Sequence, residues 1–167
     1  MAEQIIVTAQ DKKGQYEEIL PQILSVIEGE TDRIANLANV AAILKETFHF
    51  FWVGFYEVKQ PANHTEPLLI LAPFQGPLAC TRIRYNKGVC GTAWAKKTTL
   101  VVPDVEKFPG HIACSSLSRS EIVVPIVHSQ TQSVVAVLDI DSQELATFDD
   151  TDRFYLEQLT KELAALW

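Results

Sequence analysis

Apolar positions recur at helical spacing near both ends of the chain. Residues 16–27 form one such stripe, in which Pro21 is expected to start or to kink a helix. Residues 34–48 form a second stripe, which follows a polar segment that can cap a helix. Near the C-terminus, leucines at helical spacing from Leu156 to Leu166 predict a closing amphipathic helix.

The middle of the chain alternates polar loops with short runs rich in β-branched and aromatic residues, which favour strands. Strands are expected at residues 50–58, 68–74, 81–85, 99–104, 121–127 and 133–141. A short helix is expected at 88–97, and a long polar loop at 104–119. This order predicts an α+β fold, in which a mostly antiparallel sheet carries the N- and C-terminal helices on one face. No repeat or linker interrupts residues 1–167, so we expect a single domain.

The composition argues against several classes of protein. With 167 residues, 47% hydrophobic and 21% charged, the chain is typical of an ordered globular domain with one core. The formal net charge of −7 argues against nucleic acid or an anionic membrane surface as partner. No apolar run approaches the roughly 18 residues of a membrane span, and the first residues do not resemble a secretory signal. We therefore expect a cytoplasmic protein.

The two strands that flank residues 128–132, a plausible hairpin turn, bring three carboxylates together. Even-numbered positions in both strands are wholly apolar, so both sets should face the same core. The odd-numbered positions share the opposite face, and they include Glu121, Asp139 and Asp141. Antiparallel pairing places the start of the first strand beside the end of the second, so these three carboxylates should be neighbours.

Like charges on neighbouring strands are destabilising, and the cluster therefore has three interpretations. It is a solvated sheet edge, or a site where mutual repulsion raises at least one pKa and leaves a neutral acid that can donate a proton. A metal site is the third interpretation, although carboxylates without placed histidines do not specify a metal.

The three cysteines, Cys80, Cys90 and Cys114, lie in loops or at a helix start. An odd number of thiols suits a structural disulfide framework poorly, so any disulfide in the cytoplasm is expected to be transient and catalytic. A helix N-terminus favours a thiolate at Cys90. Zinc ligation with His111 as a fourth ligand is one alternative, although the spacings lack the close pairs of structural zinc sites. Three inert buried thiols are another.

Two aromatic residues of the first strand, Trp52 and Tyr56, occupy positions of the same parity. They can therefore share one face of the sheet and line a pocket there. A plain core role fits the same pattern.

Four segments in this order closely resemble the free methionine-(R)-sulfoxide reductases, a catalytic branch of the GAF fold: KGVCGTAW, VPDVEKFPGHIACSS, SEIVVPI and LDIDS. The resemblance extends over essentially the whole chain, and GAF domains in general do not combine FPGHIAC with these three cysteines. It implies that Cys114 is the nucleophile and that Cys80 is the main resolving thiol. It also implies that Cys90 is a third cysteine, which assists in recycling.

The same resemblance assigns the remaining candidate residues. It implies that Glu121, Asp139 and Asp141 bind the sulfoxide and polarise its oxygen, and that Trp52 lies near the substrate methyl group. Tyr56 is expected to line the substrate pocket on the ground of strand parity alone. It further implies a homodimer that thioredoxin regenerates, with no metal and no organic cofactor. A GAF-type binding module, which senses a small molecule or an oxidant without turnover, remains the alternative.

Overall fold

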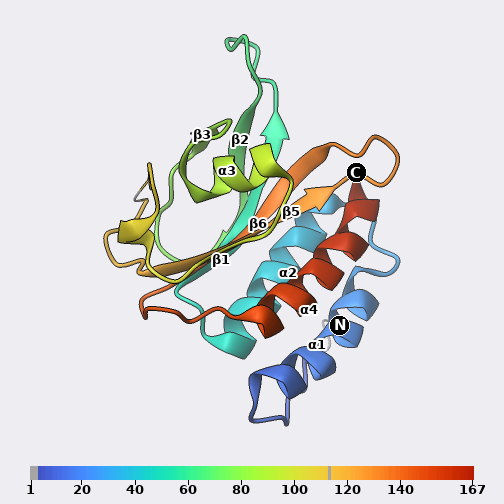
Figure 1. Cartoon of the computed structure of the whole chain (residues 1–167). Helices are drawn as coiled ribbons and strands as arrows, with labels where there is room; N and C mark the ends of the chain where they lie inside the picture. The colour runs from blue at the N-terminus through green and yellow to red at the C-terminus, as the bar shows by residue number, and fades with distance from the viewer. Residues whose placement is uncertain (1–3, 113) are drawn as a thin grey trace.

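Three helices lie together on one face of a sheet in the computed structural model, which describes residues 4–112 and 114–167 (Figure 1). They are α1 (Lys12–Ile27), α2 (Arg33–Phe48) and α4 (Asp150–Leu163). An aspartate caps each of them: the side chains of Asp11, Asp32 and Asp149 accept hydrogen bonds from backbone N–H groups of the first turn. Pro21 lies inside α1, so it does not start that helix.

Six strands form one sheet in the order β3-β2-β1-β6-β5-β4. Their bounds are β1 Trp52–Lys59, β2 Leu68–Gln75, β3 Arg82–Arg84, β4 Leu100–Val102, β5 Ser120–Val127 and β6 Val134–Ser142. Each neighbouring pair is antiparallel. The predicted α+β class, with the terminal helices on one face of an antiparallel sheet, is therefore confirmed.

The two faces of the sheet carry two separate cores. Most of the even-numbered apolar residues of β5 and β6, such as Ile122 and Leu138, are buried with α1, α2 and α4, as their alternation predicted. Val134, predicted to lie with them, belongs instead to the core on the opposite face, because the register of β5 and β6 shifts between Ile126 and Val127. On the opposite face, α3 (Gly88–Lys96) covers the sheet, and its Cys90 and Trp94 pack with Trp52 and Tyr56 of β1. The chemistry-bearing residues lie on this second face.

Two smaller features complete the described part of the chain. The loop expected at 104–119 contains a short 3-10 helix, Val105–Lys107, and a second one, Ala164–Leu166, follows α4. Within residues 4–112 and 114–167, no helix has the length and apolar character that a membrane crossing requires.

Candidate active site

The register of β5 and β6 brings the three predicted carboxylates together. Glu121 pairs directly with Asp141, and Val123 pairs with Asp139, so the three acidic side chains share the face of the sheet that α3 covers. Glu121 and Asp139 are only 6% and 7% exposed. The interpretation of this cluster as a solvated sheet edge is therefore wrong.

Burial and mutual repulsion raise the pKa values of these carboxyl groups. Burial and the charges of Asp139 and Asp141 hold the pKa of Glu121 well above its usual range. Burial and the charge of Asp141 do the same to the pKa of Asp139. Burial raises the pKa of Asp141 to about 6, although the Ser118 hydroxyl, which donates a hydrogen bond to Asp141 Oδ1, acts in the opposite direction. Burial in this site therefore favours the protonated form of the carboxyl groups, in which they can act as acids.

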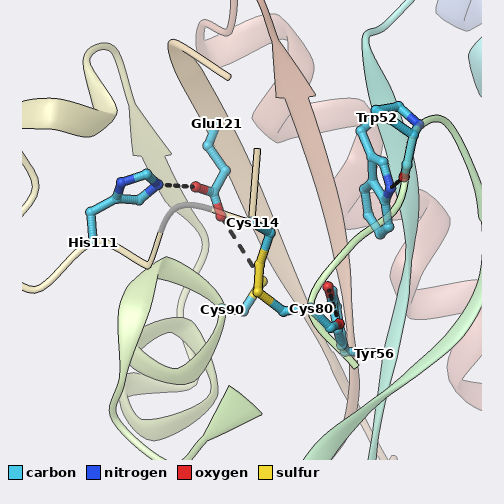
Figure 2. Close-up of a disulfide and its surroundings, with 8 residues drawn as sticks. Trp52, Tyr56, Cys80, Cys90, His111, Cys114 and Glu121 are labelled. Carbon is cyan, nitrogen blue, oxygen red and sulfur yellow. Dashed lines mark hydrogen bonds and ion pairs between the residues drawn. A yellow bond between two sulfur atoms is a disulfide. The ribbon is translucent and has the colours of Figure 1, made fainter. Parts of the chain in front are cut away.

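A disulfide joins Cys80 to Cys114 beside this acidic cluster (Figure 2). The two residues are 34 positions apart in sequence, and their Cα atoms are 5.3 Å apart. Cys114 is exposed and Cys80 is half-buried, so a second protein can reach this end of the site. The pairing implied by the family resemblance is confirmed, and zinc ligation by three free thiolates does not occur in this state.

Cys90 lies in the first turn of α3, yet the helix N-terminus does not dominate its environment. The residue is 3% exposed, and its Sγ lies 3.9 Å from Glu121 Oε1. Burial, followed by the charges of Asp139 and Glu121, raises the pKa of the Cys90 thiol well above its usual value. The predicted thiolate at Cys90 is therefore wrong, because desolvation and nearby carboxylates outweigh the helix dipole.

Trp52 and Tyr56 form an aromatic wall next to the carboxylates. Trp52 pairs with Asp141 across β1 and β6, and its ring stacks on that of Tyr56 at a centroid distance of 6.0 Å. The indole Nε1 donates to the carbonyl oxygen of Pro77 over 3.1 Å, and the Tyr56 hydroxyl donates to that of Cys80 over 3.0 Å. These bonds fix the loop that carries Cys80 against β1.

One cavity brings the predicted residues together. Of the eight site residues predicted from the sequence, seven line it: Trp52, Tyr56, Cys90, Cys114, Glu121, Asp139 and Asp141. Cys80 is not among the lining residues, but it is bonded to Cys114, which is. The cavity thus has an aromatic wall, a floor of buried carboxyl groups and a disulfide at its exposed mouth.

Polar residues outside the predicted set also line this cavity, and two of them, His111 and Ser118, lie next to its carboxyl groups. His111 Nε2 lies 3.9 Å from Glu121 Oε2, and burial lowers the pKa of the imidazole (Figure 2). Ser118 holds Asp141 through the hydrogen bond described above. The sequence indicated His111 only as a possible zinc ligand near Cys114, which it precedes by three residues, whereas no sequence pattern marks Ser118.

The chain is similar to proteins of known family. A GAF domain family model matches residues 31–167. GAF domain-containing protein A of Dictyostelium discoideum is 58% identical, over 98% of this chain and 99% of that protein. Free methionine-R-sulfoxide reductase of Saccharomyces cerevisiae is 43% identical, over 87% of this chain and 83% of that protein. Among solved structures, free methionine-R-sulfoxide reductase of Neisseria meningitidis is 56% identical, with a TM-score of 0.91, over 98% of this chain and 94% of that one.

The chain belongs to the free methionine-R-sulfoxide reductase family of GAF domains. The resemblance seen in the sequence is thus confirmed across helices and sheet alike. The Neisseria meningitidis structure was solved in complex with its substrate, as was a free methionine-R-sulfoxide reductase of Staphylococcus aureus, which is 41% identical to this chain with a TM-score of 0.81.

Proposed function

We propose that this protein reduces free L-methionine (R)-S-oxide to L-methionine. The observation that carries the proposal is the Cys80–Cys114 disulfide at the mouth of a cavity whose floor is made of buried carboxyl groups. A sulfoxide reductase needs a thiol that attacks sulfur, an acid that protonates the departing oxygen, and a second thiol. The cavity and its mouth contain all three groups.

In the first step, the Cys114 thiolate attacks the sulfoxide sulfur. The sulfoxide oxygen takes up a proton from the carboxyl cluster and is transferred to Cys114, which becomes a sulfenic acid as methionine leaves. Glu121 and Asp139 suit the role of acid because their raised pKa values keep protons available near neutral pH. Trp52 suits contact with the substrate methyl group, because its ring lines the same cavity across from Asp141.

In the second step, the Cys80 thiol condenses with the sulfenic acid, releases water and forms the disulfide. The net change is one sulfoxide and two thiols converted into one thioether, one disulfide and one water. A dithiol protein, for which we propose thioredoxin, then reduces the disulfide by exchange. The exposure of Cys114 suits this exchange. We further propose that the enzyme works as a homodimer. Cys90, buried beside Glu121, is proposed to play a minor part in recycling.

The experiment that tests the proposal is a coupled assay of NADPH oxidation with thioredoxin, thioredoxin reductase and free methionine sulfoxide. We expect turnover with the (R) epimer, far less with the (S) epimer, and methionine as the product. Binding of the sulfoxide without turnover of either epimer, with dithiothreitol as well as with thioredoxin, would favour a sensory GAF module instead.

A further inference from the structure

Three metal-binding groups converge at the floor of the cavity. Cys90 Sγ and one carboxylate oxygen from each of Glu121 and Asp139 lie within 4.8 Å of one another. All three residues are buried, with exposed fractions between 3% and 7%. They come from α3, β5 and β6, so the fold, and not one flexible loop, holds them together.

One oxygen atom in this cluster is buried without a hydrogen-bond partner. Among the described residues, Asp139 Oδ1 has no hydrogen-bond donor, although its side chain lines the cavity. A buried oxygen with unused lone pairs costs free energy unless a ligand or an ordered water supplies the missing contact. This unpartnered atom therefore points to an occupant that can be coordinated, independently of the acidic character of the cluster.

We propose that Cys90, Glu121 and Asp139 bind one borderline or soft divalent cation, such as Zn²⁺, and that this ion inhibits the protein and is not a cofactor. One thiolate and two carboxylates match the ligand preference of zinc and exclude that of magnesium, which takes oxygen ligands only and keeps much of its water. A thiolate sulfur and a carboxylate oxygen on one tetrahedral zinc lie about 3.5 Å apart, as follows from the metal–ligand bond lengths. The Cys90–Glu121 separation of 3.9 Å needs only a small closure.

The neighbouring residues leave room for this ion. His111 Nε2 lies next to Glu121 Oε2, on the opposite side of the carboxylate from Cys90, so it can hydrogen-bond to the carboxylate that the metal has deprotonated. The cavity supplies the entry path, because the three ligands and Cys114 line the same space. In the sequence, the three carboxylates alone did not specify a metal, because no softer ligand was placed beside them. The structure places the Cys90 sulfur there.

Binding must release protons. The Cys90 thiol gives up its proton to become a thiolate, and the protonated carboxyl groups of Glu121 and Asp139 give up theirs, while the metal changes no oxidation state.

The oxidised protein allows a direct test. With Cys80 and Cys114 joined in the disulfide, Cys90 is the one free thiol among the three cysteines of the chain. We expect chelator-treated, oxidised protein to bind one Co²⁺ with a near-ultraviolet thiolate-to-cobalt charge-transfer band, which Zn²⁺ abolishes by displacement and excess Mg²⁺ does not. Absence of the band, or binding without any thiolate signal, would overturn the proposal.

Matched variants locate the site. Cys90→Ser should lose the band, and Glu121→Gln should weaken Zn²⁺ binding by at least about tenfold. His128→Ala, a histidine at the hairpin outside the cavity, should bind as the wild type does. Equal zinc binding by wild type and Cys90→Ser, with circular dichroism confirming that both are folded, would also contradict the site.

The inhibitory consequence rests on the proposed function, whereas the cobalt titration does not. If the carboxylates also bind the sulfoxide, free methionine sulfoxide should compete with Zn²⁺, and Zn²⁺ should raise the apparent KM for the substrate in the assay with reductant. An absent reductase activity with an intact cobalt band would reject the proposed function and leave the metal site standing. An intact activity with no band would reject the metal site alone.

Discussion

The Tyr56 hydroxyl donates a hydrogen bond to the backbone carbonyl of Cys80, over 3.0 Å. This bond connects the aromatic wall of the cavity to the loop that supplies one half of the disulfide. Tyr56 is 1% exposed and its ring stacks on Trp52, so the donor is held in place by packing. The position of Cys80 therefore depends on a strand residue 24 positions away.

Tyr56→Phe tests this dependence. The ring and its packing remain, but the Cys80 carbonyl loses its donor, so the loop should sample more conformations before the disulfide closes. We expect the release of the first methionine to stay near the wild-type rate and disulfide formation to slow by about threefold to tenfold, given the net value of one hydrogen bond. Rapid-quench measurement of methionine and of free thiols separates the two steps. Tyr85→Phe, which removes the hydroxyl of an exposed tyrosine, serves as control. If free thiols disappeared at the wild-type rate in Tyr56→Phe, the hydrogen bond from Tyr56 would not position Cys80.

Gly54 lies between Trp52 and Tyr56 on β1, and it allows Trp52 to occupy its position. A Cβ atom on Gly54 would lie 2.7 Å from Trp52 Cη2 and 2.3 Å from Phe74 Cβ, so the indole or β2 must shift. We expect Gly54→Ala to lower the free energy of unfolding by about 1–3 kcal/mol and to raise KM for the sulfoxide. Urea denaturation and steady-state kinetics measure these two effects. If the free energy of unfolding and KM both kept their wild-type values, the added methyl group would be accommodated by the strands without a shift of the Trp52 indole.

Much of the site could be predicted from residue parity. Because side chains alternate along a strand, apolar residues at even positions of β5 and β6 forced Glu121 and Asp141 onto the opposite face, where the structure places them as a direct pair. The same rule placed Trp52 and Tyr56 on one face of β1. These predictions succeeded because they depend only on local geometry and on which face is buried.

Features that depend on contacts between loops and helices could not be predicted in this way. The pairing of Cys80 with Cys114 was implied by the family resemblance, since three cysteines in separate segments have no spacing that selects a pair. The thiolate predicted at Cys90 was wrong because the sequence does not reveal that α3 packs over the carboxylates. Ser118 was missed for a related reason, because its partner Asp141 is 23 residues away.

The three cysteines should give three different phenotypes when each is replaced by serine. Cys114→Ser should lower turnover by about 10³-fold or more, because a hydroxyl is a poor nucleophile at neutral pH. Cys80→Ser should release about one methionine per chain and then cycle slowly with thioredoxin, because the sulfenic acid lacks its partner. Cys90→Ser should be the mildest of the three, because Cys90 is outside the observed disulfide.

Peptide mapping of the wild type after one turnover without reductant provides the independent check. A dominant Cys80–Cys114 bond is expected, as in the structure. A dominant bond between Cys90 and Cys114 would reverse the resolving roles, and near-normal turnover of Cys114→Ser would reject Cys114 as the nucleophile.

The Asp141 carboxyl group should make the stability of the fold depend on pH. Asp141 has a folded-state pKa of about 6, raised by burial above the usual 3.8, so the folded protein binds more protons than the unfolded chain between these values. Its contribution to stability is therefore fully present below about pH 4 and is lost as the pH rises through about 6. Above that range, the half-buried Asp141 carries a charge that no cation of the fold neutralises among the ion pairs of the described residues.

Asp141→Asn removes that charge and keeps an oxygen that accepts the Ser118 hydrogen bond. At pH 8 we expect this variant to be more stable than the wild type by about 1–3 kcal/mol, and at pH 4 we expect the difference to vanish. Its kcat/KM for the sulfoxide should nevertheless fall by about 10²-fold, if Asp141 helps to bind or protonate the oxygen. Urea denaturation at both pH values, alongside kinetics at neutral pH, measures the two effects.

Asp149→Asn is the matched control, because the sign of its pKa shift is opposite. Burial acts to raise the pKa of Asp149, but hydrogen bonds from Lys12 and from the first turn of α4 outweigh it, so the pKa is lowered. The stabilisation by Asp149 is present above its usual pKa and is lost as the pH falls, so Asp149→Asn should be less stable than the wild type at pH 8. If Asp141→Asn were destabilised at pH 8 in the same way, the carboxylate of Asp141 would have to be stabilised by the fold. The proximity of the three carboxyl groups would then not destabilise the fold at this position.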